Sequence, residues 1–159
     1  MQDCTDSERN SIICSALSIY LLAGAPMKVE GSCHCGQISF EAEVNRDSVR
    51  ICHCTDCQML SGSAYRVSVP ADAASFILRS GTPKIYIKTA EAGNKRAHAF
   101  CPECGTQIYA ADPHQPRAYS IRVGTLKQRA VLRPGRQIWC RSALPWVTDI
   151  RDVPQTERQ

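Results

Sequence analysis

The chain has 159 residues, of which 43% are hydrophobic and 21% are charged. These values are ordinary for a globular chain and, at this length, argue against more than one sizeable domain. The formal net charge of +4 is too small to indicate a polyanionic partner by itself.

Residues 1–26 differ in composition from the rest and are predicted to be an extension outside the main domain. Residues 12–25 are mostly apolar, but this stretch is too short to span a bilayer. It has the length of a signal-peptide core, yet residues 1–10 are net acidic where a signal peptide needs positive charge. We therefore expect no membrane association, a domain over residues 27–150 and a C-terminal tail over residues 151–159.

Short stretches of alternating polar and apolar residues predict β-strands through most of the domain. The clearest is residues 37–44, and a single helical turn is expected over residues 55–60. Pro70 is expected to end the strand before it. No long helical pattern appears, so the sequence predicts a mainly β fold of small antiparallel sheets. The further strands are expected over residues 49–52, 64–69, 76–78, 84–88, 107–110 and 119–123.

Ten cysteines are many for such a chain, and they indicate either disulfide bonds or metal ligands. Seven of them stand in C-x-C, C-x-C-x2-C and C-x2-C spacings. Such near neighbours bridge poorly to each other but converge readily on a metal ion, so we favour zinc. Because thiolate ligands need a reducing compartment, we expect a cytoplasmic protein.

Two cysteine pairs, Cys33–Cys35 and Cys101–Cys104, are each followed by a glycine. The second has the composition of a zinc knuckle, with Pro102 to stiffen the turn. The glycines permit an open backbone whose N–H groups can point at the sulfurs. Together the pairs make one reasonable closed site of four thiolates, which would be structural. Sequence alone leaves open which pairs share an ion.

Cys52, Cys54 and Cys57 remain as a group of three. A zinc ion with three protein ligands keeps one position open for water or substrate. Three thiolates also favour a further thiolate over the generation of hydroxide, so chemistry on an external thiol is expected rather than hydrolysis. A redox role is disfavoured because no βαβ context surrounds the group. The alternative is a site closed by a fourth ligand from the candidates His53, Asp56, His98, His114 and Cys140.

Residues 113–148 contain several Arg and Lys residues but no Asp or Glu. A segment of one charge sign can attract an anionic ligand or nucleic acid. The alternative, which we favour, is a solvated surface whose acidic partners come from elsewhere in the chain.

Taken together, six runs resemble the glutathione-dependent formaldehyde-activating enzyme family, which includes the centromere protein V relatives. The resemblance implies a mainly β fold of the Mss4-like, β-tent type. It implies a structural zinc on Cys33, Cys35, Cys101 and Cys104, and a catalytic zinc on Cys52, Cys54 and Cys57, hence two zinc ions per chain. The matching runs are residues 31–36, 52–57, 61–63, 100–106 and the stretches 123–126 and 138–146.

The resemblance also implies a carbon–sulfur lyase that reversibly adds glutathione, or a similar small thiol, to formaldehyde or another small aldehyde. The product with formaldehyde would be S-hydroxymethylglutathione. The candidates for supplying a proton to the alkoxide are His53, Ser61, Ser63 and Tyr65. Arg66 and Ser61 are candidates for binding glutathione, and either Arg66 or the basic segment 113–148 could hold its carboxylates. The competing functions are a zinc-stabilised binding module for a protein or, less expected, nucleic acid, and a thiol or zinc carrier without turnover.

Overall fold

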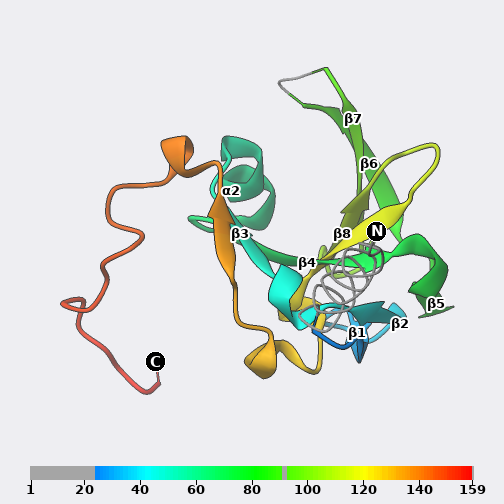
Figure 1. The fold of residues 1–159 in the computed structure, drawn as a ribbon, viewed down its shortest axis with the longest axis horizontal. Helices are drawn as coiled ribbons and strands as arrows, with labels where there is room; N and C mark the ends of the chain where they lie inside the picture. The colour runs from blue at the N-terminus through cyan, green and yellow to red at the C-terminus, as the bar shows by residue number, and fades with distance from the viewer. Residues whose placement is uncertain (1–23, 91–92, 159) are drawn as a thin grey trace, which may run out of the picture.

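The strands of the chain form one open sheet in a computed structural model that describes residues 24–90 and 93–158 (Figure 1). The expected mainly β fold is confirmed, but the strands join a single ten-stranded sheet instead of several small ones. The predicted extension lies almost wholly outside the described residues. The strands are β1 Met27–Ser32, β2 Ser39–Val44, β3 Arg50–Cys52, β4 Arg66–Asp72, β5 Ile77–Ser80, β6 Lys84–Thr89, β7 Lys95–Phe100, β8 Gln107–Ala111, β9 Ala118–Arg122 and β10 Arg136–Ile138.

The main path through the sheet runs in the order β1-β2-β4-β9-β8-β7-β6, with every neighbouring pair antiparallel. Three strands lie off this path. β5 pairs with β2, β3 pairs with β4, and β10 pairs with β3 in the parallel direction. β1 and β7 are therefore far apart in the order of strands, which matters for the cysteines at their ends.

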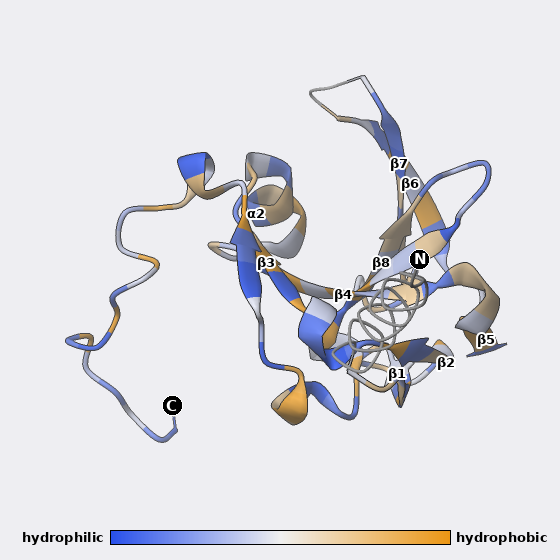
Figure 2. Ribbon diagram, viewed as in Figure 1, coloured by the Kyte–Doolittle hydropathy of each residue, from blue (hydrophilic) through white to orange (hydrophobic). Residues whose placement is uncertain are grey.

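The core follows the period-two pattern of the strands. In β2, Phe40, Ala42 and Val44 are buried while the glutamates between them are more accessible. In Figure 2 hydrophobic and hydrophilic residues are interleaved along the ribbon, as expected when each strand has one face on the core. The largest fully buried side chains include Ile38, Phe40, Ile108, Ile121 and Leu126.

Helix α2, Thr55–Ser61, follows β3 and confirms the helical turn expected from the sequence. Its N-cap is Cys54, whose Sγ accepts a hydrogen bond from the backbone N–H of Cys57 at 3.4 Å. The helix begins within the group Cys52, Cys54 and Cys57. Its N-cap and first turn therefore fix the sulfurs of Cys54 and Cys57. Across residues 24–90 and 93–158 it is the only α-helix, and no helix there has the length and apolar character needed to cross a membrane.

Pro70 does not end its strand, contrary to expectation, because β4 continues to Asp72. Pro70 faces Ser120 of β9 on one side of the strand. On the other side the pairing with β3 ends at Ser68, and β2 meets only Ala71. A proline lacks an N–H for the ladder but is tolerated where one edge of the strand is unpaired.

Candidate metal centres and the cavity beside them

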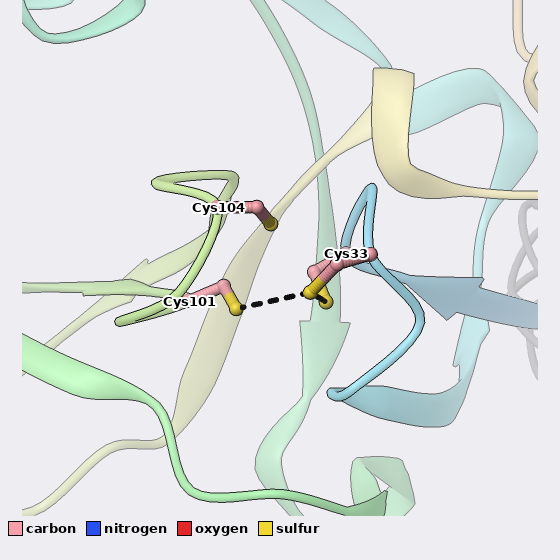
Figure 3. A group of neighbouring side chains, drawn as sticks. Cys33, Cys101 and Cys104 are labelled. Atoms are coloured by element: carbon pink, nitrogen blue, oxygen red, sulfur yellow. Dashed lines mark hydrogen bonds between the residues drawn. The ribbon is translucent and has the colours of Figure 1, made fainter.

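Cys33, Cys35, Cys101 and Cys104 form a four-cysteine cluster that joins two distant loops of the sheet. Cys33 and Cys35 lie between β1 and β2, whereas Cys101 and Cys104 lie between β7 and β8. The Sγ atom of Cys35 is 3.5 Å from that of Cys33 and 3.8 Å from that of Cys101. Figure 3 shows the side chains of the two loops turned toward one another.

Both loops contain a left-handed turn at the glycine that follows the cysteine pair, which explains that glycine. Gly36 and Gly105 have φ angles of 80° and 70°, a left-handed conformation that glycine adopts without strain. The N–H groups of Gly36 and Gly105 donate to the carbonyls of Cys33 and Cys101, at 3.1 and 2.9 Å. The N–H of Ile38 donates to Cys33 Sγ at 3.2 Å, as expected around a bound thiolate.

Cys52, Cys54 and Cys57 form a three-cysteine cluster at the end of β3 and the start of α2. The Sγ atoms of Cys52 and Cys54 are 3.6 Å apart. Arg66, the first residue of β4, donates from Nη2 to Cys57 Sγ at 2.6 Å. The hydrogen bond from Cys57 lowers the pKa of the Cys52 thiol to about 5, and the same contact raises the pKa of Cys57. One sulfur of the pair is thus readily negative.

Both clusters fit a tetrahedral zinc ion. Two sulfurs that share a zinc at about 2.3 Å lie about 3.8 Å apart, and within each cluster all the sulfurs lie within 4.8 Å of one another. Nothing in the described part of the chain adds a fourth ligand to the three-cysteine cluster. Of the candidates, Asp56 pairs with Lys88, His98 binds Arg122, and Cys140 is exposed. No disulfide joins the cysteines of the described residues.

A cavity of about 550 Å³ opens beside the three-cysteine cluster, and we call it the cysteine cavity. All three cysteines line it, so the sulfurs are reachable by a small molecule. Its other walls come from β3, β4, β6, β7, β8, β9, β10 and the segment after β10. Five of its lining side chains are cationic and one is acidic. The charged residues are Arg50, Asp56, Arg66, Lys88, Arg96 and Arg122.

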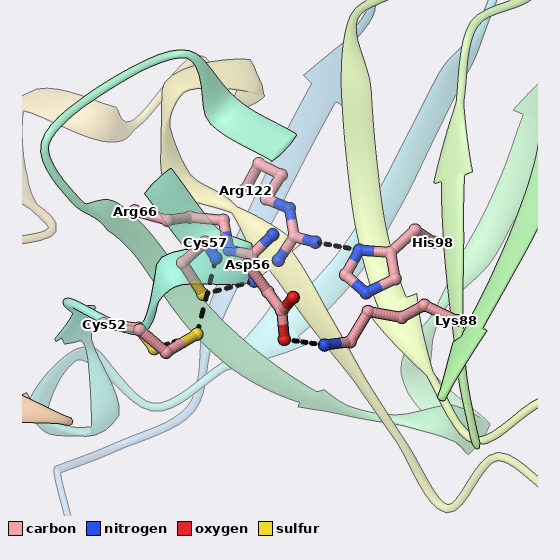
Figure 4. A network of polar contacts seen from close by, with 8 residues as sticks. Cys52, Asp56, Cys57, Arg66, Lys88, His98 and Arg122 are labelled. Carbon is pink, nitrogen blue, oxygen red and sulfur yellow. Dashed lines mark hydrogen bonds and ion pairs between the residues drawn. The ribbon is translucent and has the colours of Figure 1, made fainter. Parts of the chain in front are cut away.

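Arg122 and His98 form a buried pair in the wall of this cavity (Figure 4). Arg122 is 6% exposed and donates from Nη2 to His98 Nδ1 at 3.2 Å. Burial lowers the pKa of His98 to about 3, with help from the charge of Arg122, so the imidazole stays neutral. Because Nδ1 accepts the hydrogen bond, the ring proton is on Nε2. Burial also lowers the pKa of Arg122 to about 9, and the charge of Arg66 adds to this shift.

The other residues predicted for the site do not line the cysteine cavity, with the exception of Arg66. Ser61 donates from Oγ to the carbonyl of Cys57 at 2.6 Å and so caps the turn of α2. His53 is 1% exposed, its Nε2 lies 2.7 Å from Gln137 Oε1, and its ring meets the edge of Tyr65 at 5.7 Å. The contact of Ser61 lies within α2, and that of His53 joins the residue after β3 to β10. Their predicted roles in proton transfer and glutathione binding are untested.

Sequence reasoning named Arg122 only as one member of the basic segment 113–148, and it considered His98 only as a metal ligand. Each lies on a strand of ordinary alternation, β9 and β7, and neither belongs to a short motif. Alternation along β9 places Arg122 on the face opposite to the buried Ile121, so the strand pattern gave no signal that Arg122 is also buried.

The basic segment 113–148 does not act as one charged surface. Arg122 points inward, and Lys127 pairs with Glu30 on the neighbouring β1. Arg117 instead lines a second cavity of about 570 Å³, together with His114, Arg50 and Arg96. At Lys127 the expectation of acidic partners from elsewhere in the chain is met.

The fold is mainly β, and its two cysteine clusters could each hold a metal ion. Residues 28–142 match the family described as glutathione-dependent formaldehyde-activating enzyme, and the chain belongs to this family. Over 95 residues it is 27% identical to a Halomonas elongata protein named "Putative glutathione-dependent formaldehyde-activating enzyme". That match covers 57% of this chain and 60% of the relative's length.

A crystal structure of a Rhodobacter sphaeroides protein has a similar fold, with a TM-score of 0.53 at 20% identity. The match covers 68% of this chain and 98% of that one. At this identity the likeness concerns the fold alone.

Proposed function

We propose that this chain is a carbon–sulfur lyase that reversibly adds the thiol of glutathione to formaldehyde, giving S-hydroxymethylglutathione. The observation that carries the proposal is the exposure of three cysteine sulfurs, without a fourth ligand from the described residues, to a cavity of about 550 Å³. This volume is within the usual range for small-molecule sites, about 300–1,000 Å³. Family membership and the name of the Halomonas elongata relative support the same reaction.

Cys52, Cys54 and Cys57 would hold a zinc ion in this proposal. The chemistry that such an ion supplies is a vacant position for a thiol and the deprotonation of that thiol. Arg66 contributes a positive charge at Cys57 Sγ and so offsets the negative charge of the three thiolates.

The alkoxide that forms when the carbonyl is attacked needs a hydrogen-bond donor. His98 is the nearest fit in the cavity wall, because Arg122 occupies its Nδ1 and leaves Nε2–H to donate. A neutral imidazole with a pKa of about 3 acts here as a donor of a hydrogen bond and not as an imidazolium acid. The reduced state that the thiolates need supports a cytoplasmic location.

The test is the rate of exchange between glutathione plus formaldehyde and their adduct, measured by NMR exchange spectroscopy on zinc-loaded protein. We expect acceleration over buffer, and a loss of about 100-fold or more of that acceleration in Cys57→Ser. Cys140→Ser is the matched control, because this exposed cysteine is outside both clusters. Wild-type protein that leaves the rate equal to that of buffer would reject the lyase and favour a thiol carrier.

A further inference from the structure

Two guanidinium groups beside the three-cysteine cluster have unused hydrogen-bond donors. Among the described residues, Arg66 Nη1 and Arg122 Nε are buried and have no hydrogen-bond partner. Leaving such donors without a partner is costly, and more so when the group is charged. Figure 4 shows the ends of both side chains directed to the space next to Cys57 and Asp56.

The charges that the described residues offer do not account for both groups. Arg66 donates to Cys57 Sγ, which gives it an anionic partner when that sulfur is a thiolate. Arg122 donates to the carbonyl of Ser120 and to neutral His98, so neither of its hydrogen-bond acceptors carries charge. Asp56, the acidic side chain in the cavity wall, pairs with Lys88.

Arg66 offsets the thiolate charge at Cys57, but neutral formaldehyde gives no reason for Arg122 as a second buried guanidinium near the sulfurs. The carboxylates of glutathione are separated from its sulfur by a peptide unit on either side, so they reach further out. The second cavity, which none of the three cysteines lines, shares Arg50 and Arg96 with the cysteine cavity and adds Arg117, so it offers cations for those carboxylates. An anion held by Arg66 and Arg122 would instead lie next to the reacting carbon.

We infer that Arg66 and Arg122 form a carboxylate subsite beside the three-cysteine cluster, and that the carbonyl reactant is an aldehyde with a carboxylate on its reacting carbon. Glyoxylate is the smallest member of this class. The inference rests on the proposed function and narrows its substrate. Both guanidinium groups can donate charge-assisted hydrogen bonds to such a carboxylate, which are about twice as strong as neutral ones.

Atoms and electrons balance in this reaction as they do in any addition of a thiol to an aldehyde. The sulfur forms a bond to the aldehyde carbon, and the π electrons of the carbonyl move to its oxygen. That oxygen takes up the proton that the thiol has lost, giving a hydroxyl on the carbon that carries both sulfur and carboxylate. No oxidant or reductant is needed.

The test compares two stable thioethers of glutathione by isothermal titration calorimetry on zinc-loaded protein. S-carboxymethylglutathione carries a carboxylate where the adduct with glyoxylate has one, and S-methylglutathione lacks it. We expect the carboxymethyl compound to bind about tenfold or more tightly. This ratio is expected to approach one in Arg122→Gln and to survive in part in Arg122→Lys, which keeps the charge.

Arg79→Gln is the control, because it also removes an arginine charge but at the exposed pair with Glu41. It should leave the ratio unchanged. An Arg122→Gln protein that weakens both compounds equally would assign Arg122 a structural role and overturn the inference. So would a wild-type ratio near one.

Turnover separates this inference from the proposed function. Faster addition of glutathione to glyoxylate than to formaldehyde supports both. Acceleration with formaldehyde alone, together with a ratio near one, would retain the lyase and reject the carboxylate subsite. A tenfold ratio without acceleration of either aldehyde would reject the lyase, and the assignment of an aldehyde substrate with it.

Discussion

The four-cysteine cluster takes its ligands from two distant loops, whereas the three-cysteine cluster takes all its ligands from residues 52–57. Cys35 and Cys101 are 66 positions apart in the chain, on loops whose strands are not neighbours in the sheet. A metal shared by those loops closes a long stretch of chain and holds the two parts of the sheet together. A metal on the three-cysteine cluster adds no such connection. The comparison teaches that the number of ligands is not the only guide to a metal site's role. Ligands far apart in the chain are expected to stabilise the fold, whereas ligands close together are free to serve a reaction.

The largest expected effect comes from opening the four-cysteine cluster. Cys101→Ser should abolish cooperative folding, because structural zinc binding contributes on the order of 10 kcal/mol and a domain has about 5–15 kcal/mol in total. Loss of the near-ultraviolet circular dichroism signal and of dispersed amide resonances would report it. Cys57→Ser is the matched variant in the other cluster and should retain both signals. A folded Cys101→Ser protein would contradict the division of roles.

Stepwise removal of metal is expected to distinguish the clusters by affinity. Each chain should bind two zinc ions, and a chelator should remove the ion on the three-cysteine cluster first, because a three-ligand site open to a cavity exchanges more readily. This first step should leave circular dichroism unchanged and stop turnover. The second step should unfold the chain. Release of both ions in one step, with unfolding, would contradict the comparison.

A smaller effect concerns stability at acid pH and arises from His98 in the wall of the cysteine cavity. His98 has a pKa of about 3 in the folded chain against 6.5 for a free histidine. Below pH 6.5 the His98 imidazole takes up a proton in the unfolded chain but stays neutral in the folded chain. The free energy of unfolding therefore decreases as the pH falls from 6.5 toward 3. The expected slope is about 1.4 kcal/mol per pH unit within this window.

His98→Asn is the variant for this measurement, because its amide oxygen can accept the hydrogen bond from Arg122 as Nδ1 does. Urea unfolding between pH 6.5 and 5 should show a shallower loss of stability in the variant than in the wild type. Equal slopes would mean that His98 is accessible to protonation in the folded chain.

The candidate metal centres were predictable from the sequence because the short spacing of their cysteines is itself typical of metal ligands. Thiols two or three residues apart point to a common ion, and the trailing glycines Gly36 and Gly105 mark the left-handed turns that the structure contains. The resemblance to a known family assigned the pairs to their clusters, and the structure brings the same sulfurs together. Period two likewise predicted strands such as β2, because one face of that strand meets the core.

Of the polar residues that converge in the wall of the cysteine cavity, only Arg66 was named individually from the sequence as a candidate to bind substrate. Arg66, His98 and Arg122 come from three strands, and their convergence depends on the order of β4, β9, β8 and β7 in the sheet. Hydrogen bonding between strands is decided by tertiary packing that a single strand's pattern does not contain. The same cause explains why the prediction that Pro70 ends its strand was wrong. A proline is tolerated within β4 because of the strands that neighbour it at that position.

The long separation within the four-cysteine cluster has a consequence for biosynthesis. A ribosome adds residues from the N-terminus onward, at about 5–20 per second. All the thiols of the three-cysteine cluster have been made once Cys57 is added, whereas the four-cysteine cluster waits for Cys104. During that interval the nascent chain presents five family cysteines, including Cys33 and Cys35, to any available metal. The four-cysteine cluster, which we expect to hold the sheet together when it binds metal, is therefore the later of the two to become complete.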